Sequence, residues 1–342
     1  MESKQPRDES RGAVCLHVKR PFDIITIGKI YLTNMIKIEK KNIKNKGFYY
    51  LSEQVNTGDK FKKIQVYLGK NIPNDLSPSL LKLKNKEIVL INDCIHNLFK
   101  IENGLDLMLY NEIERVRIQF KYYFYSISQK KDELFWRDFA IKFIFESNSI
   151  EGSRLSQNEI ENIVKNNYLK KSLDRKEILE VENSIKAFNQ ITKGEFKLNQ
   201  NNIKNLHKEI VNNLGIEFGY KTKEIVVNNK KTCPPEKVKQ EMTMLINWWN
   251  QHQKEKENSF LTAIKFHQKF EYIHPFFDGN GRTGRLILIW MLQKNNYGVI
   301  LFKNKNRHKY FSALNSADEG RNNKLYRYAV DVYKNTLKEI VK

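Results

Sequence analysis

Apolar residues recur at helical spacing along most of this chain, and this periodicity limits its fold more than any other feature. The pattern begins near residue 105. Side chains three and four positions apart share one face of a helix, so each segment offers an apolar stripe to a common core. We expect a mainly α-helical body over residues 106–342. The helical segments are 107–127, 132–147, 159–166, 176–192, 200–214, 235–251, 258–274 and 282–292.

The first hundred residues differ from this body. Residues 1–20 are polar and predict a flexible tail. Within 47–70, two runs rich in aromatic and β-branched residues flank Asn56-Thr57-Gly58-Asp59, a sequence typical of a hairpin turn. We therefore expect a small α+β appendage with a β-hairpin over residues 21–105, in front of the helical body.

A second break in the helical pattern lies at 219–233. Its Ile225-Val226-Val227 run and the following Asn228-Asn229 pair predict a short β-hairpin. A small hairpin in front of a helical site could hold an extended peptide by strand addition. We expect Ile225, Val226 and Val227 to bind an extended segment of a target protein in this way.

The stretch EYIHPFFDGNGRTGRLILIW, residues 271–290, concentrates groups that carry chemistry. Pro275 ends the preceding helix and pushes His274 out of the helical region. Gly279 and Gly281 allow a close turn that leads into an apolar helix at about Arg282. Free amides and the helix dipole make such a turn an anion site.

The charged residues of this stretch suit a polyphosphate. Arg282 and Arg285 are three positions apart and share a face at the start of the helix. Asp278 precedes the turn, and a carboxylate beside phosphates commonly holds Mg²⁺. His274 is the proton acceptor in reach at neutral pH. The sequence lacks a Walker A motif, a kinase motif set and a dinucleotide-binding glycine pattern.

Residues 274–285, here called the signature loop, resemble a known family. They read HPFFDGNGRTGR and match the Fic signature, HPFx(D/E)GNGRxxR, at every fixed position. The segment 219–250 is similar to the flap and following helix of that family, and 307–329 to its C-terminal pair of helices. The resemblance covers residues 140–335 and implies a Fic-type helical bundle with a β-hairpin flap and a core at about 198–335.

The resemblance implies transfer of AMP from ATP to a hydroxyl side chain of a target protein, which could be the chain itself. By this analogy His274 is the general base, and Asp278 holds Mg²⁺. Gly279, Asn280 and Gly281 form the anion hole, Arg282 grips the β-phosphate, and Phe276 packs inward and holds the loop. Relatives often dimerise, so a homodimer is expected on the same ground.

An earlier segment, ESNSIEGS at 146–153, resembles the Fic inhibitory motif (S/T)xxxE(G/N) through Ser147, Glu151 and Gly152. Ser147 and Glu151 lie four apart on one helix face, and Gly152 is a suitable helix stop. In that family the glutamate pairs with the second arginine, here Arg285, and blocks the γ-phosphate. The resemblance thus implies an inhibitory helix at about 140–152.

The formal net charge of +21 calls for an acidic partner, although its lysines are spread along the whole chain. An alternative function of another class is a nucleic-acid-binding regulator that uses the basic N-terminal region. Removal of AMP, or use of another nucleotide, is an alternative for the same site. The sequence has no uninterrupted apolar run long enough for a membrane span and no secretion signal, so we expect a cytoplasmic protein.

Overall fold

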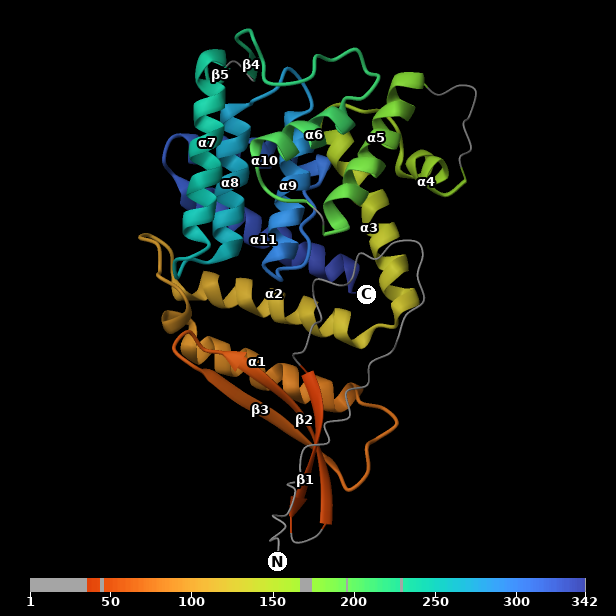
Figure 1. The fold of residues 1–342 in the computed structure, drawn as a ribbon, viewed down its shortest axis with the longest axis vertical. Coiled ribbons are helices and arrows are strands. Elements are labelled where there is room, and N and C mark those ends of the chain that lie inside the picture. The colour runs from red at the N-terminus through yellow and green to blue at the C-terminus, as the bar shows by residue number, and fades with distance from the viewer. Residues whose placement is uncertain (1–35, 44–45, 167–173, 195, 228–229, 342) are drawn as a thin grey trace, which may run out of the picture.

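The computed structural model describes residues 36–43, 46–166, 174–194, 196–227 and 230–341 (Figure 1). The tail predicted at 1–20 and the turn predicted at Asn228-Asn229 lie outside these ranges. The strands are β1 (Ile36–Ile43), β2 (Lys46–Asn56), β3 (Phe61–Gly69), β4 (Val226–Val227) and β5 (Lys230–Lys231). The helices are α1 (Ser77–Leu98), α2 (Leu107–Ser126), α3 (Gln129–Ile150), α4 (Gln157–Asn166), α5 (Arg175–Thr192), α6 (Gln200–Ile210), α7 (Pro235–His252), α8 (Ser259–Ile273), α9 (Asn280–Lys294), α10 (Arg307–Asp318) and α11 (Asn322–Ile340).

The predicted N-terminal hairpin is confirmed, but it is part of a larger sheet. β2 and β3 pair antiparallel around the predicted turn, and β1 pairs antiparallel with the other edge of β2. The sequence IKIEKKNI of β1 carries few apolar residues, and most of them stay partly accessible. Such an edge strand gives a weak alternating signal, so the prediction of a single hairpin was incomplete.

The sheet packs on α1, and α1 lies between the sheet and α2 (Figure 1). Pro78 occupies the first turn of α1, where its missing N–H is no loss. Asp106 caps α2 by accepting a hydrogen bond from the Leu109 N–H at 2.8 Å. The boundary expected at residue 105 therefore falls in a short connection between two packed helices.

The helical body surrounds α9. Every residue of this helix from Asn280 to Gln293 is buried, and α3, α5, α6 and α8 contact it. A helix buried on all sides is fixed in its position by its neighbours. Its N-terminus therefore presents the signature loop at a defined place in the fold.

The predicted helices are present, with shifted ends. α9 begins at Asn280 rather than Arg282, because Gly279 already provides the left-handed residue before the first turn. α6 ends at Ile210 rather than 214, because Asn213 and Gly215 take left-handed backbone angles. Across the described ranges, no helix combines the length and apolar character that a membrane crossing requires.

A buried ion cluster connects the sheet with α1 and α2. Lys121 on α2 donates to both carboxylate oxygens of Glu87 on α1, at 2.7 and 2.6 Å, and also to Glu53 on β2. Glu53 also accepts a hydrogen bond from the Tyr122 hydroxyl at 3.1 Å. Burial and the nearby charge of Glu87 raise the pKa of Glu53. One ammonium thus offsets two carboxylates that water does not reach.

Replacing this ammonium should destabilise the fold strongly. Lys121→Met leaves two buried carboxylates without their cation, and breaking a buried ion pair costs about 3–5 kcal/mol. Urea unfolding should show this loss, whereas Lys82→Met, at an exposed position of α1, should stay within about 0.5 kcal/mol of the parent. Equal unfolding midpoints for the two variants would contradict this account.

Candidate active site

His274 caps α8 in an uncommon conformation. Its backbone angles are φ 50° and ψ 63°, and its N–H donates to the Phe270 carbonyl at 2.9 Å. The sequence predicted an exit from the helix at this residue, and the exit is confirmed. The left-handed region is costly for a residue with a β-carbon, by roughly 1–2 kcal/mol, so surrounding contacts must hold it.

The loop after His274 is closed by its own side chains. Asn280 accepts from the Phe276 N–H at 2.9 Å and donates to the Phe276 carbonyl at 2.8 Å. The Thr283 hydroxyl donates to the Gly279 carbonyl at 2.8 Å. The first amides of α9 have no acceptor within the helix, so this rigid turn presents them together at one end. Asn280 can offer an anion its backbone amide, because its side chain is engaged within the loop.

The two glycines of the turn serve different purposes. Gly279 has φ 77°, which glycine tolerates best, as predicted. Gly281, by contrast, does not have the left-handed angles expected of a turn glycine. A β-carbon at Gly281 would lie 2.0 Å from Oε1 of Glu151, so the second glycine gives room to that carboxylate. Oε1 of Glu151 therefore lies close against Gly281, in the first turn of α9.

Phe276 supports the loop from below. Its side chain is fully buried and stacks on the imidazole of His207 from α6, with ring centroids 3.7 Å apart. Nε2 of His207 lies 2.9 Å from the Asp278 carbonyl oxygen, and burial lowers the pKa of His207 to about 4. A neutral imidazole can donate a hydrogen bond to this carbonyl. Phe276 and His207 thus hold the loop together from its buried side, and Phe276 would act on a bound anion only by positioning the loop.

Arg285 meets the predicted inhibitory residues at the end of α3. Its Nε donates to the Ser147 hydroxyl at 3.0 Å, and Nη2 donates to the Ser147 carbonyl at 2.9 Å and to Oε1 of Glu151 at 2.7 Å. The guanidinium is 3% exposed. Gly152 follows with φ 105° and ends the helix, as the sequence predicted. The predicted inhibitory residues thus bring the Glu151 carboxylate to Arg285, although the two residues are 134 positions apart in the sequence.

Arg282 is also buried, but its carboxylate partners lie farther away. Its Nη2 lies 3.5 Å from Oδ1 of Asp278, and its Nη1 lies 3.7 Å from Oε1 of Glu180 on α5. Among the described residues, none accepts a hydrogen bond from its Nε. Asp278 is 56% exposed and accepts from the Gly279 N–H at 2.5 Å. A loosely paired guanidinium beside an exposed carboxylate leaves both groups able to bind a charged ligand.

The environment of His274 keeps its imidazole neutral. Burial lowers the pKa of His274 to about 4, and the nearby ammonium of Lys221 acts in the same direction. The Glu271 carbonyl accepts a hydrogen bond from the imidazole, and the carboxylates of Glu151 and Asp278 lie near it; all three oppose the shift. A neutral imidazole at the edge of an anion site can accept a proton at pH 7.

The predicted second hairpin is confirmed in the described residues. β4 pairs antiparallel with β5, with Val226 opposite Lys231. Val226 is 60% exposed, as a strand that docks a peptide requires. Ile225 lies just before β4, and its carbonyl accepts from the Thr232 hydroxyl at 2.8 Å, which closes the base of the hairpin.

Some titratable groups near Arg285 and Arg282 were not predicted. The predicted helices gave no sign that Glu180, from α5, would approach Arg282. His267 and Glu271 lie on α8, with His267 Nδ1 at 3.9 Å from Glu271 Oε1, and His267 Nε2 lies 2.7 Å from the Tyr310 hydroxyl of α10. Burial raises the pKa of Glu271 to about 8. Spacing along α8 could have placed Glu271 near His274, but its depth depends on the packing of α9.

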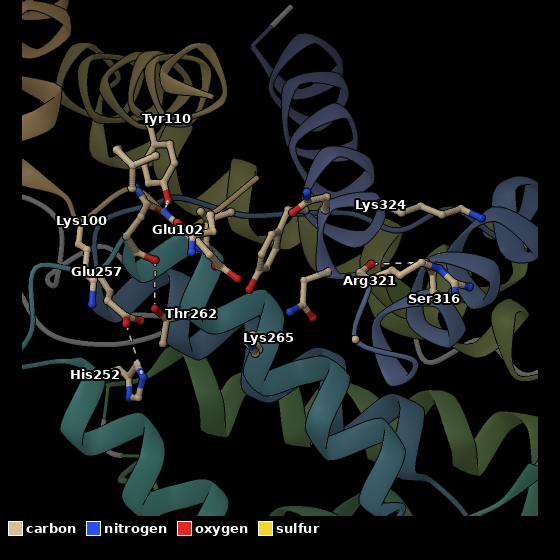
Figure 2. A pocket seen from close by; sticks show the side chains of 18 of the residues that line it. Lys100, Glu102, Tyr110, His252, Glu257, Thr262, Lys265, Ser316, Arg321 and Lys324 are labelled. Atoms are coloured by element: carbon tan, nitrogen blue, oxygen red, sulfur yellow. Dashed lines mark hydrogen bonds and ion pairs between the residues drawn. The ribbon is translucent and has the colours of Figure 1, made fainter. Parts of the chain in front are cut away.

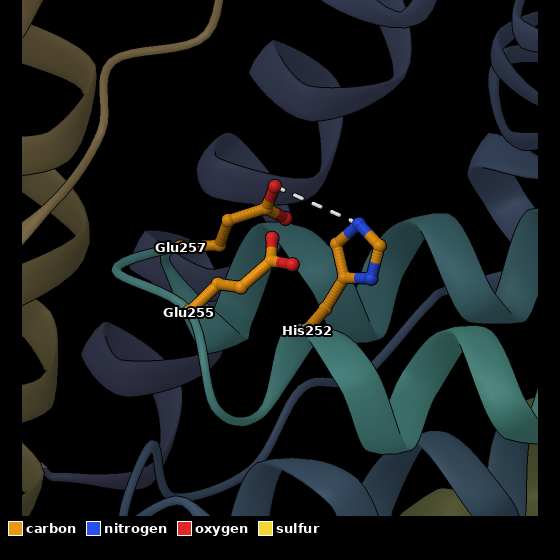
Figure 3. Close-up of side chains that lie close together, drawn as sticks. All are labelled: His252, Glu255 and Glu257. Atoms are coloured by element: carbon orange, nitrogen blue, oxygen red, sulfur yellow. Dashed lines mark ion pairs between the residues drawn. The ribbon is translucent and has the colours of Figure 1, made fainter.

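A cavity of about 860 Å³ lies at the other end of α8 (Figure 2). Residues from the connection before α2, from the start of α8 and from the turn between α10 and α11 line it. Beside it, ligand atoms of His252, Glu255 and Glu257 lie within 4.8 Å of one another (Figure 3). Such donors can hold a divalent cation. They are at the opposite end of α8 from His274 and do not belong to the signature loop.

The burial of His267 predicts how the stability of the fold changes with pH. Burial and the charge of Arg285 lower the pKa of His267 to about 3, below the value of an unfolded chain. As the pH falls below about 6.5, the unfolded chain takes up a proton that folded His267 refuses, so stability decreases. The loss from this residue should be about 2 kcal/mol at pH 5. Urea unfolding at pH 7.5 and pH 5 should show a smaller decrease for His267→Gln; equal decreases would contradict the assignment.

The sequence of this region is similar to known proteins. Residues 197–292 match the model of the Fic/DOC family. The chain is 27% identical over 214 residues to the protein adenylyltransferase Fic of Nematostella vectensis, covering 57% of this chain and 50% of that protein. It is 35% identical over 118 residues to a probable protein adenylyltransferase of Aquifex aeolicus, covering 34% and 35%. The chain spans about half or less of the length of these curated relatives.

The fold is similar to solved structures. A Fic-domain-containing signaling protein of Bacteroides thetaiotaomicron aligns with a TM-score of 0.62 at 21% identity, covering 68% of this chain and 96% of that one. Fic-1 of C. elegans (residues 134–508) aligns with a TM-score of 0.61 at 16% identity, covering 78% and 83%. The match over residues 197–292 identifies a Fic/DOC domain in that part of the chain, and the two structural likenesses show that the chain shares the fold of those proteins.

Proposed function

We propose that this chain is an autoinhibited protein adenylyltransferase that moves AMP from ATP to a hydroxyl side chain of a protein target. The names of its curated relatives support this chemistry. The contact between Glu151 and Arg285 carries the proposal. A buried guanidinium near the start of α9 donates at 2.7 Å to a carboxylate that also lies close against Gly281.

This contact acts as a brake by direct competition. The first turn of α9 and its two arginines form a site for phosphate groups. Glu151 already places a negative charge there, so a nucleotide phosphate that approaches Arg285 must displace it. Ser147 holds the same guanidinium through its hydroxyl and its carbonyl, which keeps Arg285 turned toward α3. Release of Glu151 would free Arg285 for the γ-phosphate.

The proposed transfer uses His274 as the base. The oxygen of the target hydroxyl forms a bond to the α-phosphorus of ATP, and the bond from that phosphorus to the bridging β-phosphate oxygen breaks. The hydroxyl proton passes to the neutral imidazole of His274, and pyrophosphate leaves. The amides at the start of α9 and Arg282 stabilise negative charge on the phosphates, and preorganised donors of this kind provide much of the catalysis in phosphoryl chemistry. The exposed edge of β4 would hold the target backbone beside His274.

Asp278 would hold Mg²⁺. Its carboxylate is exposed at the mouth of the turn and is a hard oxygen donor, the type that this ion prefers. Mg²⁺ takes one or two carboxylates and completes its shell with phosphate oxygens and water, so a single aspartate beside the phosphate site fits. When bound, the ion supplies neutralisation of phosphate charge.

Breaking the brake should increase transfer. Purified Glu151→Gly, incubated with Mg²⁺ and ATP labelled at the α-phosphate, should label itself or proteins of a lysate at least tenfold more than wild type, because Arg285 is then free for the γ-phosphate. Glu151→Gln keeps the length of the side chain without its charge and should show an intermediate increase. Adding His274→Ala to Glu151→Gly should abolish labelling.

The outcome separates the proposed reaction from its alternatives. Equal labelling by Glu151→Gly and by the same variant with His274→Ala would contradict the proposed base. If neither wild type nor Glu151→Gly transfers label while both bind ATP, transfer of AMP from ATP is wrong. Incubation with a target already carrying AMP, and with labelled UTP, would then test AMP removal and another donor.

Removing the metal should stop the reaction. Excess EDTA should abolish labelling by Glu151→Gly, and added Mg²⁺ should restore it. Asp278→Asn retains an oxygen for the Gly279 N–H and so preserves the turn, but lacks the charge that binds the ion. In the Glu151→Gly background it should lower the rate roughly a hundredfold, since a bound ion stabilises phosphate charge by several kcal/mol. An unchanged rate at the same Mg²⁺ concentration would show that Asp278 is not the ligand.

A further inference from the structure

Lys221 is a buried lysine that has no role in the proposed reaction. It lies in the segment before β4 and is 2% exposed. A buried ammonium is unfavourable unless hydrogen bonds satisfy it, so its partners indicate why it is there. All of the partners described below belong to the signature loop, the end of α8 or the base of the hairpin.

Two of the contacts of Lys221 lie on either side of His274. Its ammonium donates to the Ile273 carbonyl at 3.2 Å, and its backbone N–H donates to the Pro275 carbonyl at 2.9 Å. One residue therefore holds the peptide group just before His274 and the peptide group just after Pro275. His274 between them has φ 50°, a conformation that persists only where its surroundings impose it.

The third contact joins the same ammonium to the hairpin. Lys221 donates to the Thr232 hydroxyl at 2.6 Å, and that hydroxyl donates to the Ile225 carbonyl at 2.8 Å. The Thr232 N–H donates to the same carbonyl at 3.3 Å. This chain of bonds runs from the end of α8 to the base of the hairpin, where β4 begins.

We propose that Lys221 is a positioning residue that fixes the left-handed conformation of His274 and ties the base of the target-docking hairpin to it. This inference rests on the proposed function, in which His274 is the base and β4 holds the target. A base and a docking strand must be held in register for the target hydroxyl to meet the imidazole, and small misplacements of reacting groups lower rates strongly.

The charge of Lys221 adds a second effect on His274. The groups that face the imidazole are the ammonium of Lys221 from the hairpin segment, the Glu151 carboxylate from α3, the Asp278 carboxylate from the loop and the Glu271 carbonyl from α8. Lys221 is the cation among these groups, and it disfavours protonation of the imidazole. Removing it leaves two carboxylates that favour protonation, so the pKa of His274 should rise.

The test compares three variants in the Glu151→Gly background. Lys221→Met should lower kcat for labelling roughly ten- to a hundredfold while leaving the KM for ATP within about twofold, because the phosphate contacts are not touched. Lys221→Arg retains donors and charge and should restore most of the rate. Lys223→Met, at an exposed position of the same segment, is the matched control and should behave as the parent.

The pH profile distinguishes positioning from a purely structural contribution. The acidic limb of kcat should move to higher pH in Lys221→Met and stay in place in Lys221→Arg. An unchanged rate and profile for Lys221→Met would overturn the proposal, as would an equal loss in Lys223→Met. If Lys221→Met does not fold, Thr232→Val replaces it: losing only the hairpin contact should lower kcat with little change in the profile, and an unchanged kcat would overturn the link to the hairpin.

A second measurement separates this inference from the proposed function. The ring signals of His274 can be titrated by NMR without ATP or target, and assigned by their loss in His274→Ala. In Lys221→Met the midpoint should shift upward relative to wild type and Lys223→Met. If Glu151→Gly transfers no label, the proposed function fails and this titration still tests the contact. A midpoint that does not move would overturn the effect of Lys221 on His274.

Discussion

The site depends on the pairing of the buried Arg285 guanidinium with Ser147 and Glu151. A charge at that depth is strongly unfavourable unless it is paired and hydrogen-bonded, and Ser147 and Glu151 supply those partners from the end of α3. The pairing is partly exposed on the side of Glu151, whose carboxylate is 34% exposed. In the proposed function, the pair fills the phosphate site at rest, and solvent reaches the carboxylate that must be displaced. Arg285 would take part in both the resting and the active state, because its buried charge needs a negative partner in each.

Burial of α9 makes this arrangement precise. The helix is enclosed from Asn280 to Gln293, so its first turn cannot shift without disturbing the core. Four separate parts of the chain converge on the signature loop: α3 through Glu151, α5 through Glu180, α6 through His207 and the hairpin segment through Lys221. Each makes a polar contact in an otherwise apolar interior, where such contacts specify geometry strongly when they are satisfied. Preorganisation of the proposed site is thus a property of the whole helical body.

The small N-terminal sheet is attached by the same kind of contact. Lys121 joins α2 to buried carboxylates on α1 and β2, so the interface between sheet and helices is polar at its centre and apolar around it. The two regions of the chain expected to be separate therefore share packed surfaces. α2 in turn contacts α11, which contacts α8, the helix that ends at His274.

Local sequence was sufficient wherever a feature depends on neighbouring residues. Helical periodicity predicted the body, and Asn56 to Asp59 predicted the hairpin. The order of residues 274–285 placed the turn with Asp278 ahead of it and the helix start to within two residues. The inhibitory residues were named through a resemblance, and their contact with Arg285 followed. β1 was missed because an edge strand with accessible faces has little apolar pattern. Glu180, Lys221 and the depth of Glu271 could not be predicted, because they depend on which helices pack against α9. Short-range conformational preferences depend on neighbouring residues and can be read from the sequence. Burial and the pairing of distant charges arise only when the whole chain has folded.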